Sequence, residues 1–312
     1  MVRRAIASVP FGLLLSALTA CGEGDETGLS GVLVVGGPGR SAGRFVTPRG
    51  VSVDAGVVWV VDRSGRVQTL DLEGRPTGER VLVDGVRGFP IGVVARDGGA
   101  VVCDTHGSRL LRLARGAASA APEVVGTIGD GFAAPQRAAF DAAGRLFVTE
   151  FGEGEENRVR VFARDGEEVR SFGGFGHAPG RFTRPMGVVV VGDEVFVTDV
   201  RDRIVVYGTD GGFRREFGAS GDGVGALDYP YGICAIGEVL YVCEYGNHRL
   251  QRFDLAGRSL GVFGGPGAEA GRFHGPWDVA ADGDGRLWVC DAGNHRLVVV
   301  DPAAVRWTGG EA

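Results

Sequence analysis

The sequence of 312 residues predicts an all-β fold, a six-bladed β-propeller with four-stranded antiparallel blades. Two observations predict it. One sequence motif occurs six times: an aromatic or apolar residue is followed closely by proline and then by an apolar run. Successive prolines are 42 to 50 residues apart. The apolar runs are short, aromatic and β-branched, and glycine and aspartate turns bound them, which is typical of strands. Apolar residues on both strand faces indicate sheets that neighbours cover on each side, as propeller blades are covered.

Each repeat contains three landmarks in the same order. The first is proline, at positions Pro48, Pro90, Pro135, Pro185, Pro230 and Pro276. The second is an acid that ends the second apolar run, at positions Asp62, Asp104, Glu150, Asp199, Glu244 and Asp291. The third is an arginine a few residues later, at positions Arg66, Arg109, Arg158, Arg203, Arg249 and Arg296. Because all six repeats contain the acid and the arginine, we interpret them as ion pairs within each blade rather than as catalytic groups.

A ring of blades must be closed, because an open last blade would leave a strand edge exposed. Residues 31–39 resemble residues 261–267, the end of the fifth repeat. We therefore expect residues 31–36 to form an outer strand on the sixth blade. Residues 305–308 are the alternative closing segment, and both segments could take part.

The N-terminus has the pattern of an export signal. Arg3 and Arg4 precede a short apolar run, and the run ends in the sequence Leu-Thr-Ala-Cys at Cys21. This ending resembles the lipobox of bacterial lipoproteins, which implies that residues 1–20 are removed and that Cys21 is lipidated. An ordinary signal peptide is the alternative. We expect residues 21–29 to form a flexible tether and residues 30–312 the propeller, in the bacterial envelope. Gly22 favours the outer membrane in a cell that has one.

The composition excludes several classes of function. All 33 basic residues other than histidine are arginine, so the chain has no lysine for a Schiff base or a phosphate-binding loop. The formal net charge of −6 argues against nucleic acid as a partner, because phosphate binding depends on clustered cations. Glycine accounts for 56 residues without a three-residue period, which fits a protein rich in turns.

Two repeats contain a more specific motif. An acid, two residues and Asn-His-Arg-Leu occur at residues 244–250 and again at residues 291–297. Together with the Phe-x-x-Pro-x-Gly phrase, this motif resembles the NHL repeat, over roughly residues 44–310. The first, second and fourth repeats lack the Asn-His pair. The resemblance implies a six-bladed propeller.

The residue after each proline is expected near the central channel of such a propeller. These positions are Arg49, Ile91, Gln136, Met186, Tyr231 and Trp277. Their mixture of cationic, amide and apolar groups suits a protein segment or an amphipathic ligand. Our candidate binding residues are Arg49, Gln136, Met186, Tyr231, Tyr245 and Trp277. Alternatively, these side chains fill the channel.

No catalytic residue, metal site or cofactor is predicted. NHL-type propellers include a lyase that needs zinc on three histidines, but no repeat here has histidine after its proline. The acidic residues 153–156 are expected to be a solvated loop rather than a calcium site. Cys103, Cys243 and Cys290 each precede a strand-ending acid and are expected in the core. A disulfide between Cys234 and Cys243 remains open.

These inferences favour a non-catalytic binding or scaffolding module, anchored to the bacterial envelope. We expect a monomer whose partner is a protein or peptide of the envelope, with contact to the membrane through the lipid anchor and none with nucleic acid. The alternative is a metal-dependent lyase or hydrolase, because unrelated functions share this fold.

Overall fold

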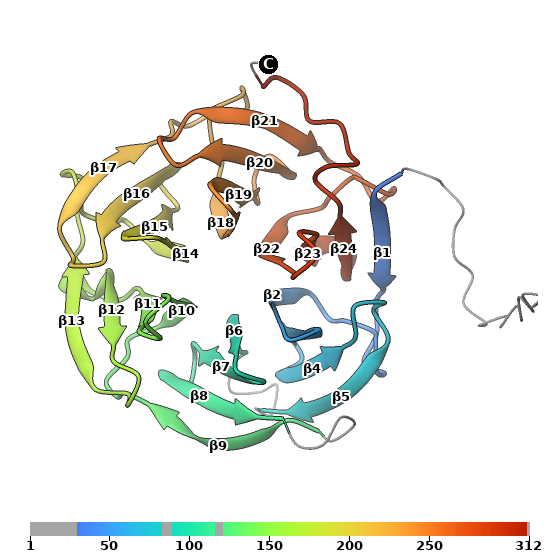
Figure 1. Ribbon diagram of the computed structural model, residues 1–312, viewed down its shortest axis with the longest axis horizontal. Helices are drawn as coiled ribbons and strands as arrows, with labels where there is room; N and C mark the ends of the chain where they lie inside the picture. The colour runs from blue at the N-terminus through green and yellow to red at the C-terminus, as the bar shows by residue number, and fades with distance from the viewer. Residues whose placement is uncertain (1–29, 83–88, 116–120, 311–312) are drawn as a thin grey trace, which may run out of the picture.

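The computed structural model describes residues 30–82, 89–115 and 121–310. These residues form six four-stranded antiparallel sheets arranged radially around a central channel (Figure 1). The predicted all-β, six-bladed propeller is confirmed. The described residues contain only two short 3₁₀ turns besides strands, η1 (Gly154–Glu156) and η2 (Ala292–Asn294), and no helix among them is long and apolar enough to cross a membrane.

In the first five blades, consecutive strands run from the channel to the outside. Blade one contains β2 (Pro48–Asp54), β3 (Val57–Asp62), β4 (Arg66–Leu70) and β5 (Pro76–Val81). Blade two contains β6 (Gly92–Arg96), β7 (Gly99–Asp104), β8 (Arg109–Ala114) and β9 (Glu123–Ile128). Blade three contains β10 (Pro135–Phe140), β11 (Leu146–Glu150), β12 (Arg158–Phe162) and β13 (Glu168–Gly173). Blade four contains β14 (Pro185–Val191), β15 (Glu194–Asp199), β16 (Arg203–Gly208) and β17 (Phe213–Phe217). Blade five contains β18 (Pro230–Ile236), β19 (Val239–Glu244), β20 (Arg249–Asp254) and β21 (Ser259–Gly264).

Blade six is completed by the other end of the chain. Its inner strands are β22 (Pro276–Ala281), β23 (Leu287–Asp291) and β24 (Arg296–Val300), and β1 (Val32–Gly36) forms the outer strand. Strand β1 pairs antiparallel with β24, from Val32 opposite Val300 to Gly36 opposite Arg296 (Figure 1). The predicted N-terminal closure is therefore confirmed. The alternative closing segment lies elsewhere, because Thr308 bridges to Val262 on the outer strand of blade five.

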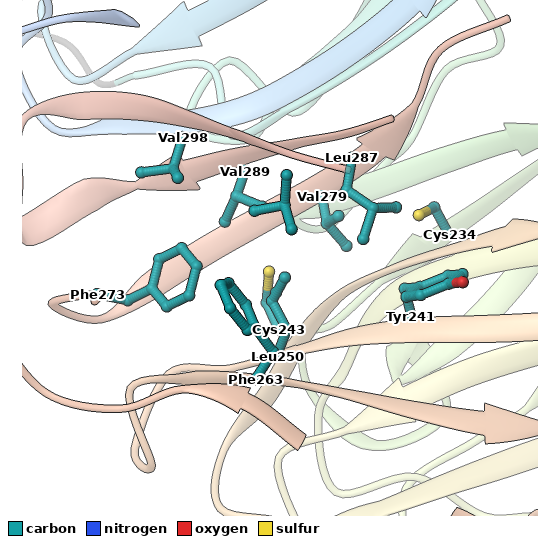
Figure 2. Packing of buried hydrophobic residues seen from close by; sticks show 11 residues of the cluster. Cys234, Tyr241, Cys243, Leu250, Phe263, Phe273, Val279, Leu287, Val289 and Val298 are labelled. Atoms are coloured by element: carbon teal, nitrogen blue, oxygen red, sulfur yellow. The ribbon is translucent and has the colours of Figure 1, made fainter. Parts of the chain in front are cut away.

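The apolar core lies between the blades rather than inside any one of them. One cluster joins Cys243, Leu250 and Phe263 of blade five to Val289 and Val298 of blade six (Figure 2). Strands such as β3, β11 and β23 are buried along their whole length, because a neighbouring blade covers each face. This accounts for apolar residues at consecutive positions of the same strand.

The acid and arginine landmarks form an ion pair in every blade, as expected. The shortest nitrogen–oxygen distances are 3.1 Å for Asp62–Arg66, 2.8 Å for Asp104–Arg109, 2.7 Å for Glu150–Arg158, 3.1 Å for Asp199–Arg203, 2.7 Å for Glu244–Arg249 and 2.7 Å for Asp291–Arg296. Most of these carboxylates also accept a backbone N–H from the loop before the proline, as Asp291 does from His274 at 2.7 Å. The pairs therefore hold the loop that leads into each inner strand.

The two Asn-His motifs connect one blade to the next. His248 and His295 adopt left-handed backbone conformations, with φ of 54° and 56°. Their Nδ1 atoms accept the backbone N–H of Gly275, at 2.8 Å, and of Thr47, at 3.0 Å. In blade four the same position is Asp202, whose carboxylate accepts the N–H of Tyr229 at 2.8 Å. Blade four thus retains the contact with a different acceptor.

The cysteines do not pair in the structure. Cys103, Cys234, Cys243 and Cys290 are free and buried. The turn after β18 places Cys234 opposite Tyr241 in the register, so it does not face Cys243, and the disulfide considered above does not form (Figure 2). Burial raises the pKa of all four thiols, and that of Cys103 to about 12. The three cysteines before the acids are core residues, as expected; Cys21 lies outside the described residues.

Candidate binding surface at the channel mouth

A buried ion pair crosses the central channel. Arg137 of blade three extends to Asp278 of blade six, on the opposite side of the ring, with 3.2 Å between Nε and Oδ2. Its guanidinium also donates to the carbonyl oxygens of Ile91, at 2.8 Å, and Arg49, at 2.5 Å. Asp278 accepts the backbone N–H of Val51 at 3.1 Å. The pair closes the channel at the position two residues after the prolines along the inner strands.

Glycine makes room for this pair. Arg137 and Asp278 are each the second residue after a landmark proline, and the other four blades have Gly50, Gly92, Gly187 and Gly232 at that position. A Cβ atom at Gly50 would lie 2.7 Å from the carbonyl oxygen of Ile91. Glycine therefore allows the inner strands to approach closely around the two charged side chains.

The pair divides the channel into two parts. On the side of the strand turns, the channel widens into a cavity of about 380 Å³, which residues of all six inner strands line. On the side of the prolines, aromatic and cationic side chains gather. We call this second part the channel mouth, and it consists of Arg49, Phe89, Phe151, Arg184, Tyr231, Tyr245 and Trp277.

Three aromatic rings of blades five and six form the centre of the mouth. Tyr231 stacks on Tyr245 with a centroid distance of 5.1 Å and lies 4.8 Å from Trp277. Tyr245 meets Trp277 edge-on at 5.4 Å. Tyr245 is 38% exposed, while Tyr231 and Trp277 are half-buried. Such a cluster offers a rigid apolar surface at little cost in side-chain entropy.

Two arginines flank these rings. The guanidinium of Arg49 lies 4.5 Å from the centre of the Trp277 ring, and that of Arg184 lies 4.1 Å from the ring of Phe151. Among the described residues, no carboxylate forms an ion pair with either arginine. Burial, together with the nearby charges of Arg63 and Arg137, lowers the pKa of Arg49 to about 10. An anion placed here would stabilise a cation that the protein leaves uncompensated.

Several buried polar atoms of this region have no hydrogen-bond partner among the described residues. They are Nε of Arg49, Nε of Arg184, Nε1 of Trp277 and Oε1 of Gln136. Unpaired buried polar groups are costly, and each one calls for an explanation. Three of the four are donors, so this region has too few hydrogen-bond acceptors among the described residues.

The structure brings together four of the six predicted binding residues, which are Arg49, Tyr231, Tyr245 and Trp277. Gln136 and Met186, expected in the same surface, are instead 0% and 1% exposed. Both side chains are buried, and Gln136 donates from Nε2 to the backbone carbonyl of Ala134 at 2.9 Å. These two side chains therefore do not contribute to an exposed binding surface.

Sequence reasoning missed Arg184, Phe151 and Phe89. Arg184 and Phe89 directly precede landmark prolines, and Phe151 follows a landmark acid, as Tyr245 does. The signal was therefore present in the position before each landmark proline and in the position after each landmark acid. Phe89 lies 5.6 Å from the guanidinium of Arg49 and 5.4 Å from the ring of His106.

The described residues contain no group of three histidine, cysteine, aspartate or glutamate side chains that could hold a metal ion. In the acidic loop, Glu155 pairs with Arg181 at 2.7 Å, and Glu156 accepts the backbone N–H of Glu153 at 3.1 Å. These carboxylates are exposed, as a solvated loop requires.

Comparison with known proteins agrees with this architecture. A family model described as the NHL repeat matches residues 273–300, the part of the chain that contains the second Asn-His motif. The chain carries an NHL repeat. No curated protein sequence matches the chain.

Solved structures extend the similarity to the whole fold. A protein of unknown function from Bacteroides thetaiotaomicron is 16% identical, with a TM-score of 0.66 over 86% of this chain and 75% of that one. Streptogramin B lyase is 12% identical, with a TM-score of 0.58 over 87% and 98% of the two chains. The WD40 β-propeller domain of Doa1 is 11% identical, with a TM-score of 0.58 over 83% and 81%. At these identities the similarity establishes the fold alone.

Proposed function

We propose that this NHL propeller is a non-catalytic binding module that docks a segment of a protein or peptide on the channel mouth. One observation carries the proposal. Arg49 and Arg184 lie beside an aromatic cluster, without a carboxylate partner among the described residues, and buried donor atoms around them are unsatisfied. Aromatic and arginine side chains dominate binding energy at protein interfaces.

The chemistry of the mouth specifies the segment further. Tyr231, Tyr245 and Trp277 offer apolar contact, and the two arginines offer charge-assisted hydrogen bonds to a carboxylate. A segment with an acidic side chain or a C-terminal carboxylate next to an apolar residue would satisfy both. Because Arg137 and Asp278 block the channel, the segment must lie on the mouth rather than pass through it.

The test is photo-cross-linking in the native cell. A photoreactive phenylalanine analogue replaces Tyr245 in one variant and Phe175, which is 52% exposed outside the mouth, in the control. We expect the Tyr245 position to capture a defined partner that the Phe175 position does not. Introducing Tyr231→Ala and Trp277→Ala together should abolish that capture. Equal capture at both positions, or capture that survives the double substitution, would contradict the proposal.

We further propose that the module is held at the bacterial envelope by lipidation of Cys21, with an outer-membrane location favoured by Gly22. The support is the sequence pattern alone, an apolar export segment that ends in Leu-Thr-Ala-Cys. Replacing Cys21 with serine should release the protein from the membrane fraction and abolish labelling with a fatty-acid analogue. A serine variant that stays bound to the membrane would exclude this anchor.

A further inference from the structure

A second candidate site lies away from the mouth, between blades two and three. It is a cleft of about 360 Å³ near the strand turns, within the range of roughly 300–1,000 Å³ typical of ligand sites. Val101, Leu113, Ile128 and Leu146 form an apolar floor, and each is less than 10% exposed. Arginine side chains surround this floor.

The equivalent space between blades five and six is filled by the chain itself. There Trp307, from the segment after the last strand, packs with its ring 5.7 Å from Tyr241 and 5.8 Å from Phe263. The guanidinium of Arg252 lies 4.8 Å from the centre of the same indole ring. Arg252, Tyr241 and Phe263 of blade five thus form a site that the indole ring of Trp307 occupies.

The repeat register shows that the two places correspond. Val101 and Tyr241 each stand three residues before a landmark acid, and Arg112 and Arg252 each stand three residues after a landmark arginine. Ile128, like Phe263, ends the outer strand just before its final glycine. The cleft is therefore the site of Trp307 repeated in blade two.

Two equivalent glycines show that the site in blade five is occupied and that the cleft in blade two is not occupied by any described residue. A Cβ atom at Gly261 would lie 3.3 Å from Cβ of Trp307. The corresponding residue of blade two is Gly126, and a Cβ atom there would have no heavy atom within 4 Å. Among the described residues, no side chain takes the place of the indole in the cleft.

The charge around the cleft is positive. Arg96 and Arg164 share one carboxylate, that of Asp97, at 3.7 Å and 3.6 Å. Arg112 is exposed, and no described carboxylate forms an ion pair with it. Four arginines, Arg96, Arg112, Arg115 and Arg164, therefore line the cleft together with one acid, Asp97.

We propose that this cleft binds a small planar aromatic carboxylate. The ring lies against Arg112 and the apolar floor, as Trp307 lies against Arg252, and the carboxylate accepts hydrogen bonds from Arg96 or Arg164. Stacking on a guanidinium and charge-assisted hydrogen bonding both favour arginine over other cations in such a site.

Isothermal titration calorimetry with indole-3-acetate tests the proposal. We expect one site per chain and a dissociation constant at least about tenfold weaker for neutral indole-3-acetamide and for non-aromatic cyclohexylacetate. Absence of binding, or equal binding of either analogue, would overturn the proposal.

Two substitutions locate the site. Arg112→Gln should weaken binding of indole-3-acetate about tenfold, and Gly126→Leu should abolish it by filling the space left for the ring. Arg170→Gln, which removes an equal charge from the exposed outer strand of blade three, is the control and should have no effect. Binding that is insensitive to Arg112→Gln would place the ligand elsewhere and refute the assignment, even if Gly126→Leu failed to fold.

The internal repeat supplies an independent measurement. Trp307→Ala should vacate the site in blade five and so add a second, weaker site for indole-3-acetate, because blade five retains Arg252 for the ring but has Ile236 where blade two has Arg96. An unchanged stoichiometry in a folded Trp307→Ala protein would contradict the equivalence of the two sites.

Discussion

Arg137 and Asp278 lie 3.2 Å apart although 140 residues separate them, and their contact links opposite blades of the ring. Neither side chain is more than 7% exposed. Burial raises the pKa of Asp278, and the charge of Arg137 opposes that rise. The pair thus fixes the two halves of the propeller to one another at the channel.

Asp278→Ala should destabilise the protein by about 3–5 kcal/mol, because it leaves the guanidinium of Arg137 buried and unpaired. Urea denaturation provides the measurement. Asp193→Ala, which breaks an exposed pair with Arg214, is the control and should cost less than about 1 kcal/mol. Replacing both channel residues with Arg137→Met and Asp278→Leu should restore most of the lost stability. Equal losses of stability in Asp278→Ala and Asp193→Ala would show that the channel pair contributes no more to stability than an exposed ion pair.

Strand β1 should contribute to stability through Val35 rather than through its exposed residues. Val35 packs in the core with 6% exposure, whereas Leu33, two residues earlier on the same face of the strand, is 47% exposed. Val35→Ala should therefore lower the free energy of unfolding by about 2 kcal/mol, because it removes two buried methyl groups and leaves a cavity. Leu33→Ala should change stability by less than about 0.5 kcal/mol. Thermal denaturation of the two variants distinguishes them, and identical melting temperatures would argue against closure by this strand in solution.

His248 should make stability depend on pH. Burial lowers its pKa, and the neighbouring His274 lowers it further, while Nδ1 accepts a hydrogen bond from Gly275. The unfolded chain then binds its proton at higher pH than the folded chain, so stability is present above the unfolded value of about 6.5 and is lost as pH falls through the folded pKa.

The measurement is denaturant unfolding at about pH 7.5 and about pH 5.5. His248→Asn keeps a side-chain acceptor, as Asp202 does in blade four, but does not titrate in this range. It should lose less stability on acidification than the unmodified protein. His177→Asn is the control, because His177 is exposed. A pH dependence unchanged by His248→Asn would assign the effect to other groups.

The core cysteines should be unreactive in the folded state. Burial disfavours their thiolates, which are the reactive form. In a Cys21→Ser protein, a thiol reagent such as Ellman's reagent should label none of the four promptly under native conditions and all four in denaturant. Fewer than four thiols after denaturation would reveal a disulfide that the structure does not contain.

The sequence was sufficient to predict the blades, since every repeat needs the same buried ion pair and the same inner proline. The closing strand was also predictable, because residues 31–36 must resemble the outer strand whose place they take. The disulfide idea failed because the turn after Ile236, rather than the proximity of Cys234 and Cys243 in sequence, sets the register.

The channel pair was harder to find, although its signal is present. Four glycines occupy one position of the repeat, and Arg137 and Asp278 occupy the remaining two, three blades apart. Only a closed six-fold ring makes those two positions opposite one another. The burial of Gln136 and Met186 depends on side-chain packing between strands, which a repeat alignment does not contain.

The direction of β1 determines at which rim of the propeller the chain enters the ring. Val32 lies opposite Val300, so the chain enters its outer strand at the rim of the strand turns and moves from there towards the level of the prolines. The first described residues therefore lie at the rim of the turns, on the opposite face of the ring from Tyr231 and Trp277. A neighbouring molecule can reach these two aromatic side chains without contacting the strand that closes the ring.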